Sequence, residues 1–226
     1  MKLVFTNTKG GVGKSTLAVH AAVWLFEQGL RVAVLDLDPQ RSSSVWIAEA
    51  EPGITIRTAD TPENAVSEAT ELSRFNDFVV ADGPGGLTDL SRCLLLIADL
   101  ALFPITPSIL DVRSVQGATA ILRYAQQING GRPEGRLILN RMRPRETISR
   151  EVKGAADTLG LTVALHSIRD LQAFRDAAQQ GTTVGRLGPR AKQAAIDLHL
   201  MLHGLLDHSV TAIRDQRLEQ RRAGND

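Results

Sequence analysis

A glycine-rich segment near the start of the chain, KGGVGKST at residues 9–16, constrains the fold more than any other feature. It follows the apolar run Leu3–Phe5 and precedes a helical pattern that begins near Ser15. Strand, glycine turn and helix in this order are typical of a phosphate-binding P-loop, in which backbone N–H groups and a helix N-terminus face an anion. Lys14 can reach the terminal phosphates, and Ser15 can ligate Mg²⁺. The segment therefore predicts a site for a nucleoside phosphate and magnesium.

We expect the nucleotide to be held by the turn and by the first residues of the helix. The glycines let the chain curl with its N–H groups facing inward, where side chains would block the phosphates. The residues predicted to bind the nucleotide here are Gly10, Gly11, Val12, Gly13, Lys14, Ser15 and Thr16.

Apolar runs alternate with amphipathic helical patterns along most of the chain, which predicts an α/β fold. The runs are continuous, as in strands that are buried on both faces of a parallel sheet. We therefore expect a doubly wound, mostly parallel sheet with helices on both faces. The length of 226 residues suits one domain. We place that domain at residues 1–208 and a charged tail at 209–226.

Three aspartates follow apolar runs at positions where a parallel sheet presents its carboxyl edge. Asp36 and Asp38 come after the run 31–35, and Asp82 comes after the run 78–81. Because Asp36 and Asp38 are two residues apart, they would share a face in extended chain. Asp82 is predicted to serve magnesium, because a buried strand delivers a carboxylate to the same edge as the P-loop.

The segments KGGVGKST, DLDPQ at 36–40 and DGPGG at 82–86 together resemble the ParA/MinD family of deviant Walker A ATPases. Ser42–Trp46 continue the pattern of the short ParA-like members, and we expect this chain to lack the N-terminal helix-turn-helix of larger members. The resemblance implies that Lys9 contacts the nucleotide of a partner subunit, while Lys14 contacts the nucleotide of its own subunit. It also implies that Asp38 positions the attacking water, that Asp36 supports the magnesium shell and that Asn140 contacts adenine.

The resemblance further implies a slow ATPase that dimerises on ATP and releases its partners after hydrolysis. Such an ATP- and Mg²⁺-dependent homodimer binds DNA without sequence preference, and a ParB-like or cargo-adaptor protein stimulates hydrolysis. The expected function is the partition of plasmid or chromosomal DNA. The alternative is the positioning of a protein cargo, such as a carboxysome or a chemoreceptor cluster, and the sequence leaves both open.

Basic residues are concentrated in one segment, which makes a charge-guided DNA contact plausible. Residues 132–153 hold seven Lys or Arg against three Asp or Glu, a local charge of +4 on a chain of net charge +1. A solvated basic surface accounts equally well for any single residue. The DNA-binding candidates are Arg143, Arg145, Arg150 and Lys153, with Arg190, Lys192 and the tail arginines as a second group.

Three other classes of nucleotide-binding protein fit the sequence less well. A single cysteine, Cys93, cannot supply a subunit's two ligands for a nitrogenase-type iron–sulfur cluster, and a small-molecule kinase lid is not evident. A MinD-like membrane helix needs bulky apolar residues, but the tail offers only Val210, Ile213 and Leu218 among many charges. We therefore expect a cytoplasmic protein, nucleoid-associated when ATP-bound, without stable membrane association.

Overall fold

The computed structural model describes the chain except residues 107, 109–110, 112–113, 144–149 and 224–226. The described strands are β1 (Lys2–Asn7), β2 (Val32–Asp36), β3 (Thr55–Thr58), β4 (Phe78–Gly85), β5 (Leu100–Ile105), β6 (Glu134–Leu139) and β7 (Thr162–Val163). The described helices are α1 (Lys14–Glu27), α2 (Ser42–Ala50), α3 (Pro62–Phe75), α4 (Asp89–Ile97), α6 (Gln116–Ile128), α7 (Arg150–Thr158), α8 (Gln172–Gln179) and α9 (Lys192–Ala223), with short 3₁₀ turns η1 (Val184–Arg186) and η2 (Gly188–Ala191).

The strands form one parallel sheet in the order β3-β2-β4-β1-β5-β6-β7. The central strand β1 ends at Asn7, immediately before the P-loop, and its neighbours on either side are β4 and β5. In a sheet of this kind, ligands bind outside the carboxyl ends of the strands where the chain order reverses. The topology therefore places the P-loop at such a point.

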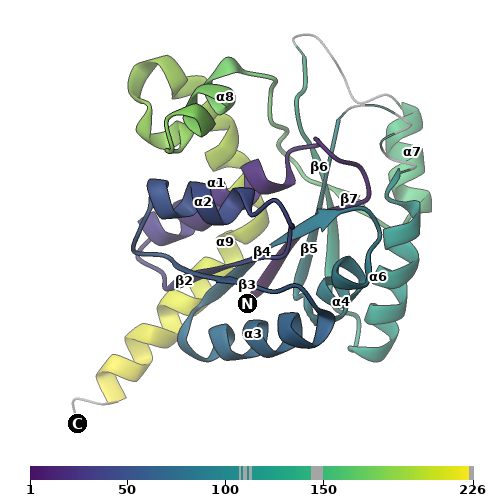
Figure 1. The fold of residues 1–226 in the computed structure, drawn as a ribbon, viewed down its shortest axis with the longest axis horizontal. Coiled ribbons are helices and arrows are strands. Elements are labelled where there is room, and N and C mark those ends of the chain that lie inside the picture. The colour runs from purple at the N-terminus through teal and green to yellow at the C-terminus, as the bar shows by residue number, and fades with distance from the viewer. Residues whose placement is uncertain (107, 109–110, 112–113, 144–149, 224–226) are drawn as a thin grey trace.

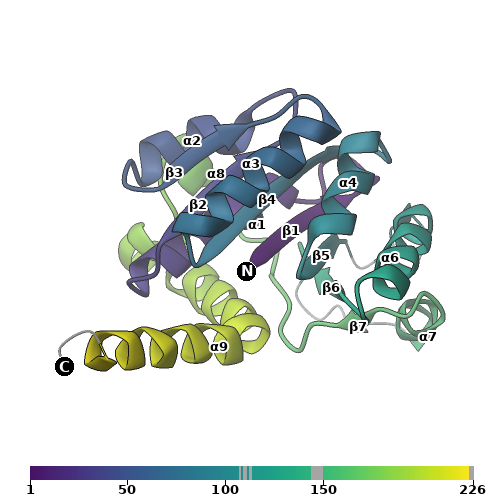
Figure 2. The same cartoon turned by 90° about the horizontal axis from the view of Figure 1, so that it is seen from below.

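Alternating side chains of the strands pack on opposite faces of the sheet, and helices cover both (Figure 1 and Figure 2). Leu3 and Phe5 join the apolar cluster of α1, α2, α8 and α9, whereas Val4 joins the cluster of α3 and α4. A third cluster joins β5 and β6 to α6 and α7. The parallel, doubly covered sheet confirms the predicted fold class. Cys93 is buried in the second cluster.

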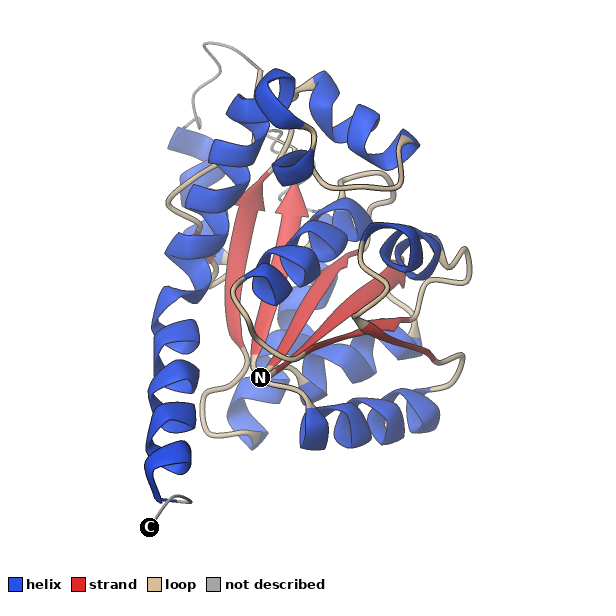
Figure 3. Ribbon diagram, turned by 90° about the vertical axis from the view of Figure 1, so that its left-hand side faces the viewer, coloured by secondary structure: helices blue, strands red, loops and turns tan. Residues whose placement is uncertain are grey.

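The long C-terminal helix α9 extends past the edge of the sheet (Figure 1 and Figure 3). The predicted domain boundary at residue 208 falls inside this helix, which continues without a break to Ala223. Val210 is 4% exposed, and Ile213 packs against the same cluster as α1. The first part of the expected tail is therefore packed against the body of the protein, and the boundary itself stays a prediction.

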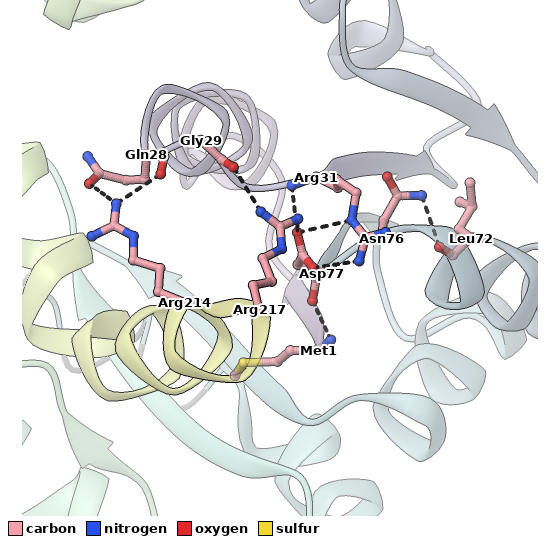
Figure 4. Close-up of polar contacts among 9 residues, drawn as sticks. All are labelled: Met1, Gln28, Gly29, Arg31, Leu72, Asn76, Asp77, Arg214 and Arg217. Carbon is pink, nitrogen blue, oxygen red and sulfur yellow. Dashed lines mark hydrogen bonds and ion pairs between the residues drawn. The ribbon is translucent and has the colours of Figure 1, made fainter. Parts of the chain in front are cut away.

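Two arginines of α9 attach this helix to the end of α1 (Figure 4). Arg214 donates hydrogen bonds to the carbonyl and the side chain of Gln28, and Arg217 donates to the carbonyl of Gly29. Cations favour the C-terminal end of a helix, where carbonyl groups lack partners. Arg217 also pairs with Asp77, whose carboxylate is 5% exposed and also binds Arg31.

Candidate nucleotide-binding site

A cleft of about 520 Å³ opens at the carboxyl edge of the sheet, beside the P-loop. A volume of this order suits a small-molecule ligand. The predicted residues that line it are Gly10, Gly11, Gly13, Lys14, Ser15, Thr16 and Asp38. Residues from β4 and α2 complete the wall, among them Ser42 and Gly85. The fold therefore brings most of the predicted phosphate-binding segment to one hollow.

The P-loop curls because two of its glycines take conformations that other residues adopt at a cost. Gly11 has φ 73° and Gly13 has φ 99°, and α1 begins immediately afterwards at Lys14. The N-terminus of α1 thus faces the cleft with its unpaired N–H groups and partial positive charge. This arrangement provides an anion site, as the sequence predicts.

Lys14 lies inside the cleft and is only 7% exposed. Its ammonium donates a hydrogen bond to the carbonyl of Lys9 at 3.4 Å. Burial lowers the pKa of Lys14, and the negative charges of Asp82 and Asp38 oppose that decrease. A buried ammonium directed into an anion site is well placed to hold phosphate oxygens.

Asp82 is fully buried and carries two carboxylate oxygens with no hydrogen-bond partner among the described residues. Burial raises its pKa to about 7, and the charge of Asp36 adds to the shift, while the nearby Ser15 and Ser43 hydroxyls and Lys14 oppose it. A buried carboxylate without partners is costly unless another group satisfies it. The residues therefore fit a divalent cation held near Asp82 and Ser15.

The small number of protein oxygens at this place is consistent with magnesium, which needs few protein ligands. Within the described ranges, no group of three His, Cys, Asp or Glu side chains is assembled as a cage for a metal. Magnesium usually keeps several waters and combines one or two protein oxygens with substrate phosphates. When bound, the ion would neutralise phosphate charge during hydrolysis.

The two aspartates after β2 are placed differently from each other. Asp38 lines the cleft, and its carboxylate accepts a hydrogen bond from the Gln40 N–H at 2.9 Å. Asp36 is fully buried and accepts from the Asp38 N–H, and from the N–H and hydroxyl of Ser44. β2 ends at Asp36, so Asp38 lies just beyond the strand, and its N–H bonds back to the Asp36 carboxylate. Their predicted roles stay predictions.

Lys9 lies outside the set of residues that line the cleft, at the opening of the P-loop. Its ammonium forms an ion pair with Asp111, and its side chain is 50% exposed. Neighbouring bonds tie the same stretch to the chain after β5, because Thr8 donates to the Ser114 carbonyl and Asn7 donates to the Pro104 carbonyl. Lys14 and Lys9 therefore occupy distinct places, one inside the site and one beside it.

A smaller hollow of about 110 Å³ adjoins the main cleft through Gly13, Thr16 and Arg141. Asn140 and Phe174 also line it. The Asn140 amide donates to the Val12 carbonyl at 2.8 Å, so this predicted base-contacting residue bonds to the P-loop backbone. Val12 itself is buried and takes part through its backbone.

His20 is a residue near the site that the sequence reasoning missed. Its ring is fully buried, with Nδ1 2.7 Å from the Thr16 carbonyl and Nε2 accepting from the Val184 N–H at 3.1 Å. Trp46 packs edge-on against it. Burial lowers the pKa of His20 to about 4. A neutral histidine thus joins the start of α1 to η1, and nothing in its local sequence signals this.

The DNA-binding candidates do not form one described group. Arg145 lies outside the described residues, as do the side chains of Arg150 and Lys153, although α7 begins at Arg150. Arg190 and Lys192 are exposed on η2 and at the start of α9. In the tail, Arg214 and Arg217 are engaged in the contacts of Figure 4. Arg143, also in the first group, has a partner within the chain.

Comparison with known proteins matches this architecture to one family. Residues 3–184 match the CobQ/CobB/MinD/ParA nucleotide binding domain. The chain is 30% identical over 210 residues to the maintenance of carboxysome distribution protein A of Halothiobacillus neapolitanus, covering 90% of this chain and 95% of that protein. It is 32% identical over 127 residues to protein ParA of Rhizobium radiobacter, covering 55% and 56%.

A solved structure shares the fold over nearly the whole chain. The cell division ATPase MinD of Pyrococcus furiosus superposes with a TM-score of 0.72 at 19% identity, covering 91% of this chain and 98% of that one. The matched domain includes the P-loop, Asp82 and Asn140. This chain belongs to the ParA/MinD family of nucleotide-binding domains.

Proposed function

We propose that this protein is an ATP-driven molecular switch that dimerises around two nucleotides and positions a cargo on DNA. The observation that carries the proposal is the different placement of the two P-loop lysines. Lys14 is buried in the cleft, whereas Lys9 is half-exposed at its opening and free of the cleft wall. Because Lys9 lies outside the cleft, it does not duplicate the contact of Lys14 with the phosphates of its own subunit, and we assign it to the nucleotide of the partner subunit.

Electrostatics give Lys9 a role between two subunits. Two nucleotides facing each other repel through their phosphates, and a cation crossing the interface offsets that repulsion. In this proposal Lys14 and Ser15 hold the phosphates and magnesium, Asp82 supports the ion and Asp38 orients the attacking water. Hydrolysis then removes the charge that drew Lys9 across, and the dimer separates.

Dimerisation also explains how DNA binding can depend on ATP. Two subunits present twice as many basic residues to one duplex, and the second contact then forms at high effective concentration. The +4 segment 132–153 and the exposed pair Arg190 and Lys192 support this part of the proposal. No residue in this account reads bases, so binding is without sequence preference.

Two classes of cargo fit the switch. Partition of plasmid or chromosomal DNA is the first, and the similarity to ParA supports it. Positioning of a protein assembly is favoured by the similarity to a carboxysome distribution protein, because that match spans nearly the whole of both chains. In either case a ParB-like or adaptor protein would stimulate hydrolysis.

A membrane-bound switch is the less favoured alternative. Val210 and Ile213 pack into the body of the protein, so a membrane-binding face on α9 retains only Leu218 as an exposed bulky residue of the three. In the part of the chain that the structure describes, no helix combines the length and apolar character needed to span a bilayer.

The proposal is tested by sedimentation and by DNA titration. With ATP and Mg²⁺ the protein should sediment as a dimer, and with ADP as a monomer. Lys9→Ala should weaken the dimer while leaving nucleotide binding by the monomer largely intact. The ATP form should shift two unrelated duplexes alike, with affinity falling steeply as salt rises. A monomer under all conditions would contradict the switch.

A further inference from the structure

Asn140 follows the last residue of β6, and backbone bonds fix the chain on both sides of it. Its N–H donates to the Ile105 carbonyl at 2.7 Å, and the Met142 N–H donates to the Ile168 carbonyl at 2.9 Å. Between them Arg141 has φ 58°, a left-handed conformation that costs energy for a residue with a side chain. Asn140 itself is 5% exposed, so its side chain starts from a fixed point and has little room to move.

From this fixed position the Asn140 amide reaches the P-loop, 128 residues away in the sequence. Nδ2 donates to the Val12 carbonyl at 2.8 Å, and the bond is buried. The same nitrogen lies against Gly13, where an added Cβ would come within 2.2 Å of it. Asn140 is therefore in contact with two consecutive residues of the loop.

A bond to the Val12 carbonyl also orients the next N–H group. The peptide between Val12 and Gly13 is planar and trans, so its C=O and N–H groups point in opposite directions. Holding the carbonyl toward Asn140 directs the Gly13 N–H to the other side. Backbone N–H groups at this place in a P-loop are the groups that cradle phosphates.

We propose that Asn140 is a positioning residue, which fixes the P-loop through Val12 and thereby sets the affinity for the phosphates. One of its two amide N–H donors is committed to the loop, and the other donor and the amide oxygen remain for the adenine contact that the resemblance implies. The inference rests on the nucleotide-binding part of the proposed function and is independent of dimerisation and of DNA.

The test compares ligands with and without a base. Binding of ADP, GDP and pyrophosphate, each with Mg²⁺, is measured by calorimetry for the wild type, Asn140→Ala and the similarly shaped Asn140→Leu. These ligands lack the γ-phosphate, so binding is read apart from ATP-driven dimerisation. Loss of one hydrogen bond that fixes the loop should weaken all three by a similar factor of about three to ten.

Asn76→Ala provides a matched control for general destabilisation. Asn76 also donates its amide to a backbone carbonyl, that of Leu72 at 2.9 Å, but it lies beside Asp77 (Figure 4). It precedes the first residue of β4, whereas the cleft is at the other end of that strand. This variant should leave the three affinities unchanged. Thermal melting of each ligand-free variant reports any shared loss of stability.

The outcomes distinguish a failure of the proposed nucleotide binding from a failure of the positioning role of Asn140. If the wild type binds neither ADP nor pyrophosphate, the proposed nucleotide function fails. If the wild type binds and the Asn140 variants weaken ADP alone, with pyrophosphate unchanged, Asn140 reads the base and the positioning role is wrong. Unchanged affinities for all three ligands would equally overturn it.

Discussion

Lys9 and Asp111 form an ion pair that joins the opening of the P-loop to the chain following β5. The Asp111 side chain is 1% exposed, and it also accepts from the N–H and hydroxyl of Thr106. Burial alone would raise the pKa of Asp111, but the bonds from Lys9 and Thr106 outweigh it and hold the pKa below its usual value. In the monomer Lys9 is thus held by its own chain, and a role in a partner subunit requires it to leave Asp111.

The first prediction is that Asp111 opposes dimerisation. Asp111→Asn keeps the shape of the side chain and removes the charge that attracts Lys9. Lys9 can then leave its own chain and reach the nucleotide of the partner subunit at a lower cost in free energy. The ATP-dependent dimer should then form at a protein concentration about three- to tenfold lower, the range expected for weakening a partly exposed ion pair. Sedimentation across a concentration series measures this shift.

A double variant provides the control for this prediction. In a Lys9→Ala background there is no ammonium to release, so Asp111→Asn should not tighten the dimer further. A weaker dimer in Asp111→Asn alone would show instead that Asp111 positions Lys9 for the interface.

The second prediction separates nucleotide binding from hydrolysis. Lys14→Ala removes the buried cation of the phosphate site and should abolish nucleotide binding. Asp38→Ala should still bind ATP but hydrolyse it at least about a hundredfold more slowly, because water orientation matters chiefly in the transition state. Fluorescent-nucleotide titration and single-turnover phosphate release measure the two quantities.

Asp38→Asn refines the second prediction. It can still accept the hydrogen bond from the Gln40 N–H, so the turn is retained while the charge is lost. Slow hydrolysis in both Asp38 variants assigns the effect to the charge. If Asn restored normal turnover, the aspartate would matter only for the shape of the turn.

The sequence predicted those parts of the site that lie within one continuous segment of the chain. The P-loop and the strand that ends near Asp82 are encoded in contiguous segments, whose apolar runs and glycines specify both the elements and the edge of the sheet at which they meet. The fold class followed from the same alternation of runs. The structure places Lys14 and Asp38 at the cleft, while the chemical roles of these residues stay predictions.

Contacts between distant segments could not be predicted in this way. The bond from Asn140 to Val12 and the pair of Lys9 with Asp111 depend on which strand ends lie side by side, which the sequence alone does not specify. The same is true of the two bonds that Ser44, near the start of the next helix, donates to the Asp36 carboxylate.

The third prediction concerns pH and the buried His20. Its pKa is lowered to about 4 in the folded protein from an ordinary value of 6.5, so the unfolded chain binds more protons between these values. The stabilisation is complete above pH 6.5 and is lost progressively as the pH falls toward 4. His20→Leu cannot take up a proton, so its stability should fall less over this window.

Urea unfolding at pH 7 and pH 5 measures the third prediction. The variant is expected to be less stable at pH 7, because the Val184 N–H loses its acceptor. The quantity that tests the prediction is the change in the free energy of unfolding between pH 7 and pH 5, compared between wild type and variant. An equal loss of stability in wild type and variant would mean that His20 does not remain neutral in the folded state.

The fourth prediction divides the basic residues into those available to DNA and those that hold the fold. Arg217 pairs with Asp77, a nearly buried carboxylate, and caps the end of α1 at Gly29 (Figure 4). Arg217→Gln should therefore lower the free energy of unfolding by about 1–2 kcal/mol, because Asp77 keeps Arg31 but loses one charged partner. The affinity of the ATP-bound protein for DNA should stay unchanged.

Reversal of the exposed pair should have the opposite effect. Arg190→Glu with Lys192→Glu should leave the free energy of unfolding nearly unchanged and should weaken binding to every duplex alike. The salt dependence should also become shallower, by about one unit in the slope of log affinity against log salt for each phosphate contact that is lost. Anisotropy of a labelled duplex at several salt concentrations, beside urea unfolding, measures both quantities. If Arg217→Gln weakened DNA binding as much as the double reversal, the arginines at the end of α9 would belong to the DNA-binding surface, and their contacts with Gln28 and Asp77 would have to break when DNA binds.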